Sequence, residues 1–178
     1  MKKNTNLFAV LLWLLFCAGC ATTTHDIHVE ARSDPMVDLS NYKTYAWQGL
    51  AAIEHEPLAV WKPLNLDVEQ ELKWLIKREL RDIGMTEVTV NPDMYVTFTI
   101  GIDMSDWELQ KMPTENLEPR DSVPQGELYV ILIDAVTGYL AWVGKAQANI
   151  KYQPTVEEVR KRLNFSIIKM FELYPVVN

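Results

Sequence analysis

The sequence predicts an α+β fold: a two-layer sandwich in which an antiparallel sheet has two helices packed on one face. Three observations predict it. Apolar residues alternate along 94–104, and 127–135 and 139–150 also have strand character. Residues 68–83 and 156–174 repeat apolar residues every three or four positions, which is typical of amphipathic helices. The order of these segments lacks the regular strand–helix alternation of a parallel sheet.

A first strand is expected near the start of the folded region. Ile27, Val29 and Ala31 alternate with polar residues, and Asp34-Pro35 ends the pattern. Residues 38–47 begin with turn-forming side chains and continue as a β-prone aromatic run. Residues 48–63 have no steady period and are expected to form a loop.

Both helices carry terminal signals. Either Asn65 or Asp67 can cap the first helix, and Gly84 follows its last apolar residue. Thr155 and Glu158 match a capping box at the start of the second helix. These signals predict two independent helices separated by strands.

The strands at 127–135 and 139–150 form a predicted hairpin. Val136-Thr137-Gly138 joins them, and its glycine can take the left-handed conformation of a short turn. A three-residue turn places Ile131 opposite Val143. In this register the residues expected beneath the helices are Leu128, Val130, Leu132, Leu140 and Trp142. Those expected on the opposite, open face are Tyr129, Ile131, Ile133, Tyr139, Ala141 and Val143.

The N-terminal residues have the grammar of an export signal. Lys2 and Lys3 precede an apolar run at 7–16, which is too short to span a bilayer. Ala18-Gly19-Cys20 resembles the bacterial lipobox, although Cys17 stands where leucine is usual. This resemblance implies a lipoprotein signal peptide at 1–19 and lipidation of Cys20. An ordinary secretory signal cleaved near Ala21 is the alternative.

The rest of the chain is divided accordingly. Residues 20–26 are expected to be a lipidated tether and residues 27–178 a single α+β domain. The residue after Cys20 is alanine and not aspartate, which by the sorting rule of enteric bacteria favours the periplasmic face of the outer membrane over the inner membrane. The formal net charge of −7 argues against nucleic acid as a partner.

Several spaced motifs resemble one family of bacterial lipoproteins, the domain of unknown function 4136. Residues 33–47 resemble its opening signature, with Leu39 in place of phenylalanine. The other matching motifs are Asn91-Pro92-Asp93-Met94, the hairpin 126–144 with Asp134, Thr137-Gly138 and Trp142, and Tyr174-Pro175. The family typically has aspartate and arginine at the positions of Ile131 and Val143. The resemblance implies no activity, because none is established for that family.

No catalytic constellation is visible, and the sequence predicts a protein that is not an enzyme and has no cofactor or metal site. The apolar residues of the open face, Tyr129, Ile131, Ile133, Tyr139 and Val143, predict an interaction surface for an envelope protein. The alternative is a binder of a small apolar ligand or lipid, with the loop 105–125 as its lid. That loop carries Trp107, Leu109 and Met112, which could equally cover the face without any ligand.

Overall fold

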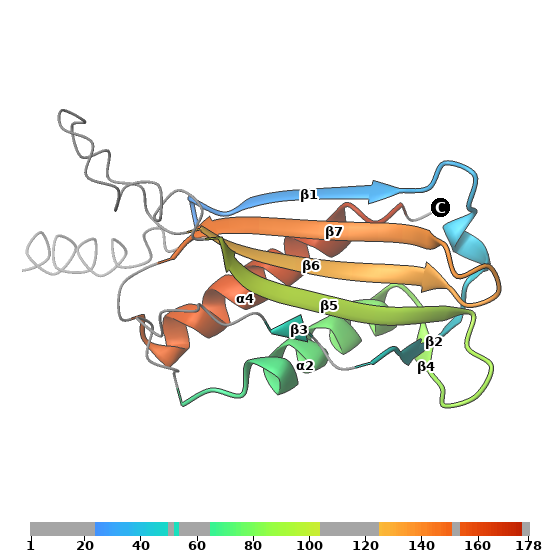
Figure 1. Ribbon diagram of the computed structural model, residues 1–178, viewed down its shortest axis with the longest axis horizontal. Helices are drawn as coiled ribbons and strands as arrows, with labels where there is room; N and C mark the ends of the chain where they lie inside the picture. The colour runs from blue at the N-terminus through green and yellow to red at the C-terminus, as the bar shows by residue number, and fades with distance from the viewer. Residues whose placement is uncertain (1–23, 50–51, 54–64, 104–124, 151–153, 176–178) are drawn as a thin grey trace, which may run out of the picture.

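The computed structural model describes residues 24–49, 52–53, 65–103, 125–150 and 154–175 (Figure 1). They form a two-layer α+β fold, as predicted. The sheet has the strand order β1-β7-β6-β5-β2-β4, and β3 pairs with β5 beside this path. The strands are β1 (His28–Ser33), β2 (Thr44–Trp47), β3 (Ala52–Ile53), β4 (Thr86–Glu87), β5 (Met94–Asp103), β6 (Gln125–Asp134) and β7 (Leu140–Asn149).

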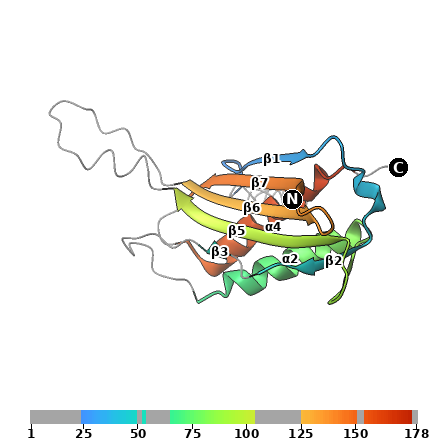
Figure 2. The same ribbon diagram turned by 45° about the vertical axis from the view of Figure 1, so that its right-hand side comes forward.

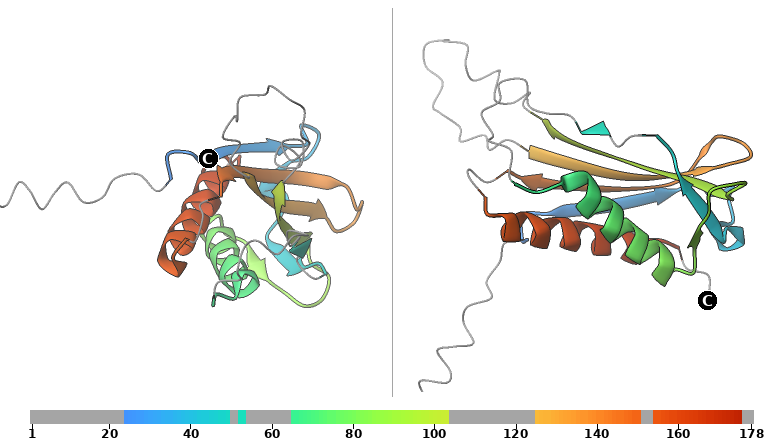
Figure 3. Two further views of the ribbon diagram at one scale, coloured as in Figure 1. Left: turned by 60° about the vertical axis from the view of Figure 1, so that its left-hand side comes forward. Right: turned by 90° about the horizontal axis from the view of Figure 1, so that it is seen from below.

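Two helices, α2 (Val68–Asp82) and α4 (Val156–Glu172), lie on the same face of this sheet (Figure 3). Asp67 caps α2 by accepting a hydrogen bond from the Gln70 N–H. The capping box of Thr155 and Glu158 is present at the start of α4, as predicted. Neither of the helices described is long and apolar enough to cross a bilayer.

The sheet is mixed, and this differs from the expected antiparallel arrangement. The long strands β1, β7, β6 and β5 are antiparallel neighbours, whereas the short strands β2 and β3 run parallel to β5, and β4 runs parallel to β2. The cause is the position of α2 between β2 and β5 in the chain. A helical crossover brings the chain back so that the next long strand runs in the same direction as the strand before it.

The core lies between the sheet and the helices. The alternation along β5 is confirmed, because Met94, Val96 and Phe98 are buried. Trp142 on β7 is also fully buried and packs against Phe171, with ring centroids 5.3 Å apart. The large indole explains a small neighbour. A Cβ atom on Gly144 would lie only 2.6 Å from the Trp142 ring, so glycine is needed there.

The predicted hairpin register is right at its centre and wrong near the turn. Ile131 pairs with Val143, but an irregularity between Leu132 and Ile133 places Ile133 opposite Leu140. This bulge shifts the side chains of β7 by one position. Leu140 is therefore exposed and Ala141 buried, which reverses the prediction for both.

The segment before β1 contacts the domain already at Asp26, a residue that the sequence placed in the tether. Asp26, expected in the tether, accepts two hydrogen bonds from the Arg162 guanidinium of α4, at 2.8 and 2.7 Å. It also accepts one from the Asn149 N–H at the end of β7. The guanidinium holds the pKa of Asp26 at about 2. The ordered domain therefore begins no later than this clamp.

Candidate interaction face

The face of the sheet away from the helices carries at its centre a cross-strand row whose middle residues, Ile131 and Val143, are apolar. The row runs across three strands, from Thr97 on β5 to Ile131 on β6 and Val143 on β7. Arg32 on the edge strand β1 continues it. The next row, toward the hairpin, pairs Ile133 with Leu140. We call Ile131, Ile133, Leu140 and Val143 the apolar patch.

The side chains predicted for this face lie on it, with two exceptions, which are Ala141 and Tyr139. Tyr129, Ile131, Ile133 and Val143 are half-buried, since each is flanked by side chains of neighbouring strands. Figures 1 and 2 show the two helices behind the sheet. Within the described part of the chain, the strands and helices therefore leave this face without a second layer.

An ion pair borders the apolar patch on the side away from the hairpin. Lys145 Nζ lies 2.8 Å from a carboxylate oxygen of Glu127 and 5.4 Å from the centroid of the Tyr129 ring. The Tyr129 hydroxyl donates a hydrogen bond to the same carboxylate. The Glu127 carboxylate raises the pKa of Lys145 to about 12. This pair is not among the residues predicted from the sequence, although the hairpin register alone places the two charges on one face and near each other.

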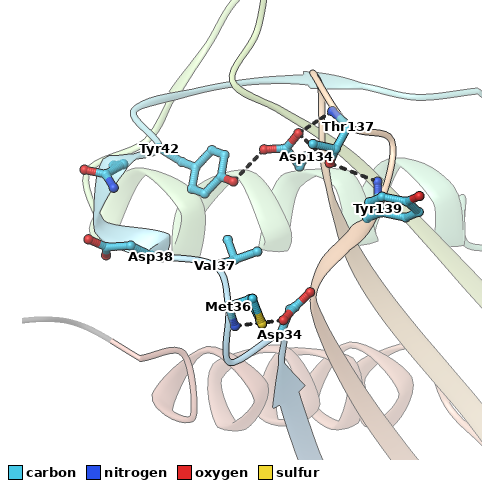
Figure 4. A pocket seen from close by; sticks show the side chains of 9 residues that line it. Asp34, Met36, Val37, Asp38, Tyr42, Asp134, Thr137 and Tyr139 are labelled. Atoms are coloured by element: carbon cyan, nitrogen blue, oxygen red, sulfur yellow. Dashed lines mark hydrogen bonds between the residues drawn. The ribbon is translucent and has the colours of Figure 1, made fainter.

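Tyr139 is the second exception, after the buried Ala141, among the residues predicted for this face. It lies in the turn before β7, is 75% exposed, and lines a hollow at the hairpin end of the sheet (Figure 4). The hollow has a volume of about 280 Å³. It is lined by Asp34, Met36, Val37, Asp38, Asn41, Tyr42, Asp134, Thr137 and Tyr139. Three carboxylates and two phenols therefore line a hollow beside the short turn that the sequence predicts at 136–138.

Asp134 is the best-bound side chain of the hollow. One of its oxygens accepts a hydrogen bond from the Tyr42 hydroxyl at 2.6 Å. The other accepts hydrogen bonds from the backbone N–H groups of Val136 and Thr137 and from the Thr137 hydroxyl. These donors, Tyr42 first, hold the pKa of Asp134 at about 2. Such a carboxylate is a weak base at neutral pH and is poorly suited to proton transfer. Its hydrogen bonds stabilise the turn.

Asp93, just before β5, also connects to the segment at the start of β2, as Asp134 at the end of β6 does. Its carboxylate accepts hydrogen bonds from the N–H groups of Lys43 and Thr44 and from the Thr44 hydroxyl, at 2.7–2.9 Å. The Asp93 N–H donates in turn to that hydroxyl. The donors lower the pKa of Asp93, with the Lys43 N–H as the largest cause. This reciprocal pair fixes the start of β2 against the start of β5.

The residues that carry the family resemblance therefore meet at one end of the sheet. Tyr42 and Thr44 come from the opening signature, Asp93 from the second motif and Asp134 from the hairpin. They bond across about 50 and 92 positions of the chain. Each motif is visible in the sequence, but the contacts between the motifs are not, because they depend on the parallel placement of β2 beside β5.

Some predicted residues lie outside the described part of the structure. Trp107, Leu109 and Met112 belong to 104–124, and Cys20 precedes residue 24. Among the residues that are described, no three acidic, histidine or cysteine side chains are grouped as cation ligands.

Comparison with protein families gives a match. The model of a domain of unknown function, DUF4136, matches residues 29–176. The comparison with curated proteins gives no match.

Several solved structures are similar to this chain at low sequence identity. A DUF4136 family protein from Bacteroides thetaiotaomicron is 9% identical, with a TM-score of 0.51, over 81% of this chain and 95% of that one. A PDZ domain protein from Parabacteroides distasonis is 17% identical, with a TM-score of 0.53, over 94% of this chain and 39% of that one. A PelC dodecamer from Paraburkholderia phytofirmans is 14% identical, with a TM-score of 0.47, over 84% of this chain and 99% of that one.

Proposed function

We propose that this chain, which belongs to the DUF4136 family, is a lipid-anchored lipoprotein of the cell envelope that binds another envelope protein through the open face of its sheet. In this proposal residues 1–19 are a signal peptide, and lipidated Cys20 holds the domain at the periplasmic face of the outer membrane. The role is binding and not catalysis.

The apolar patch is the observation that carries the binding role. Ile131 and Val143 form a direct cross-strand pair at its centre, at the two positions where the family typically has aspartate and arginine. An ionic pair suits a face in contact with water, whereas an apolar pair is stabilised when it is covered. The Lys145–Glu127 pair beside the patch supplies a polar rim, which is a common arrangement in protein interfaces.

The partner would therefore present apolar side chains to Ile131 and Val143 and polar groups to Lys145 and Glu127. The net charge of −7 supports a protein partner over nucleic acid. Binding of a small apolar ligand or lipid is the second candidate, because the same apolar patch would bind it.

Photo-cross-linking in living cells tests the binding role. A photoreactive residue replaces Ile133 in the full chain, and the same residue replaces Arg81 on the exposed side of α2 as the matched control. We expect a protein adduct from position 133 and none from position 81. Adding Val143→Arg should abolish the adduct, because it places a charge in the apolar patch without entering the core.

The outcomes separate the candidates. An adduct with a lipid or another small molecule would favour ligand binding, and a protein adduct that survives Val143→Arg would contradict docking on the apolar patch. Mass spectrometry of the N-terminal peptide tests the anchor independently. An unmodified Cys20 in the mature protein would refute the lipoprotein assignment, and membrane fractionation would distinguish the outer from the inner membrane.

A further inference from the structure

The two edges of the sheet differ in length. One edge ends in β4, which has only two residues, and so short a strand offers little for another chain to pair with. The other edge is β1, with six residues paired to β7 on one side only. Figure 1 shows β1 as the outermost long strand. Among the described residues, β1 therefore presents the one long edge of the sheet.

The ladder with β7 determines which backbone groups of β1 face outward. The Asp34 N–H donates to the Ala141 carbonyl, so the even-numbered residues of β1 point their backbone groups toward β7. The N–H and C=O groups of Val29, Ala31 and Ser33 therefore point to the free edge.

The side chains along this edge alternate in charge. Glu30 and Arg32 lie on the open face and are 59% and 80% exposed. Their contact within one chain is long, at 3.8 Å, and both are well solvated, so this ion pair contributes little to folding. Val29 and Ala31 point the other way and pack against the core.

We propose that β1 pairs antiparallel with β1 of a second copy of this chain, with Ala31 on the two-fold axis. Ala31 then faces its own copy, and Val29 faces Ser33 of the second copy, so every outward backbone group of these residues obtains a partner. The contact is isologous and closes as a two-fold dimer. The two sheets become continuous through strand addition.

Charge selects this register over its neighbours. With Ala31 on the axis, Glu30 lies directly opposite Arg32 of the second copy, and the reciprocal pair forms as well. These are non-hydrogen-bonded positions, where facing side chains come closest. Moving the axis by one residue places Glu30 opposite Glu30, or Arg32 opposite Arg32, and like charges directly opposite are destabilising. The edge is therefore complementary to itself, which favours a second copy over an unrelated strand.

Charge reversal tests the pairing in the purified full chain. Sedimentation velocity in detergent should give a dimer for the wild type. Glu30→Arg should weaken the dimer by about tenfold or more in dissociation constant, because both cross-axis pairs become repulsive. The double variant Glu30→Arg with Arg32→Glu should restore it. Both side chains are exposed, so circular dichroism should show an unchanged fold in every variant.

Cysteine pairs test the register. Glu30→Cys and Arg32→Cys chains, oxidised as a mixture, should form a disulfide-linked dimer, because non-hydrogen-bonded partners have Cα atoms about 4.5 Å apart. Each variant alone should not exceed the parent, which has the same native cysteines. A monomeric wild type, a dimer insensitive to Glu30→Arg, or equal cross-linking in the single-variant samples would each overturn the proposal.

Discussion

Replacing Asp26 with asparagine should lower the free energy of unfolding at neutral pH by about 2 kcal/mol. The Arg162 guanidinium lowers the pKa of Asp26 from 3.8 to about 2, and one unit of pKa corresponds to about 1.4 kcal/mol. The side chains of Asp26 and Arg162 are only 14% and 12% exposed, so solvent screens the pair weakly. Asparagine keeps the shape of the side chain and removes its charge.

The effect has a defined pH dependence. Because the pKa of Asp26 is depressed in the folded state, its contribution is complete above about pH 4 and is lost as the pH falls through about 2. Urea unfolding of wild type and Asp26→Asn between pH 7 and pH 2 should therefore give two curves that converge in acid. Asp82→Asn, in a more exposed ion pair with Arg81 at 3.5 Å, is the matched control and should change stability by less than about 0.5 kcal/mol.

Two results would refute this reasoning. A loss as small as that of the control would mean that the clamp contributes no more than a surface pair. A loss that stays constant down to pH 2 would mean that the effect of the substitution does not come from the charge of Asp26.

Two further substitutions test the hollow and the core. Tyr42→Phe removes the strongest donor to Asp134, so the pKa of Asp134 should rise from about 2 toward 3.8. An NMR titration of the Asp134 carboxyl carbon measures this pKa, and an unchanged value would mean that the hydrogen bond is unimportant. Gly144→Ala should lower the free energy of unfolding by about 1–3 kcal/mol, because the new methyl group overlaps the Trp142 ring. Urea titrations measure this loss, and an unchanged free energy of unfolding would mean that the ring moves aside without cost.

Local patterns predicted the long elements well. The alternation of β5 and the capping box of α4 depend on residues close together in sequence, and both are confirmed. The hairpin centre was also predictable, because a short turn determines which residues face each other. Ala141 was assigned to the wrong face because a bulge changes the parity of a strand and leaves no mark in an apolar segment.

The short strands and the hollow could not be predicted from local sequence patterns. β3 and β4 have two residues each, too few to show any period. The pairing of Ile131 with Val143 was predicted correctly, because both lie in the regular part of the hairpin. Tyr139 was misplaced because it belongs to the turn, where side chains do not alternate.

The bonds of Tyr42 and Thr44 have a consequence for how this family is recognised. Their partners Asp134 and Asp93 come from segments far away in the chain, and all four side chains hold backbone segments together. A signature composed of such residues reflects the contacts that hold distant segments of the chain together. Solvent-facing strand positions such as Ile131 and Val143 can therefore be substituted in evolution while the signature persists. Relatives identified by the signature would share the fold without having to share a binding partner.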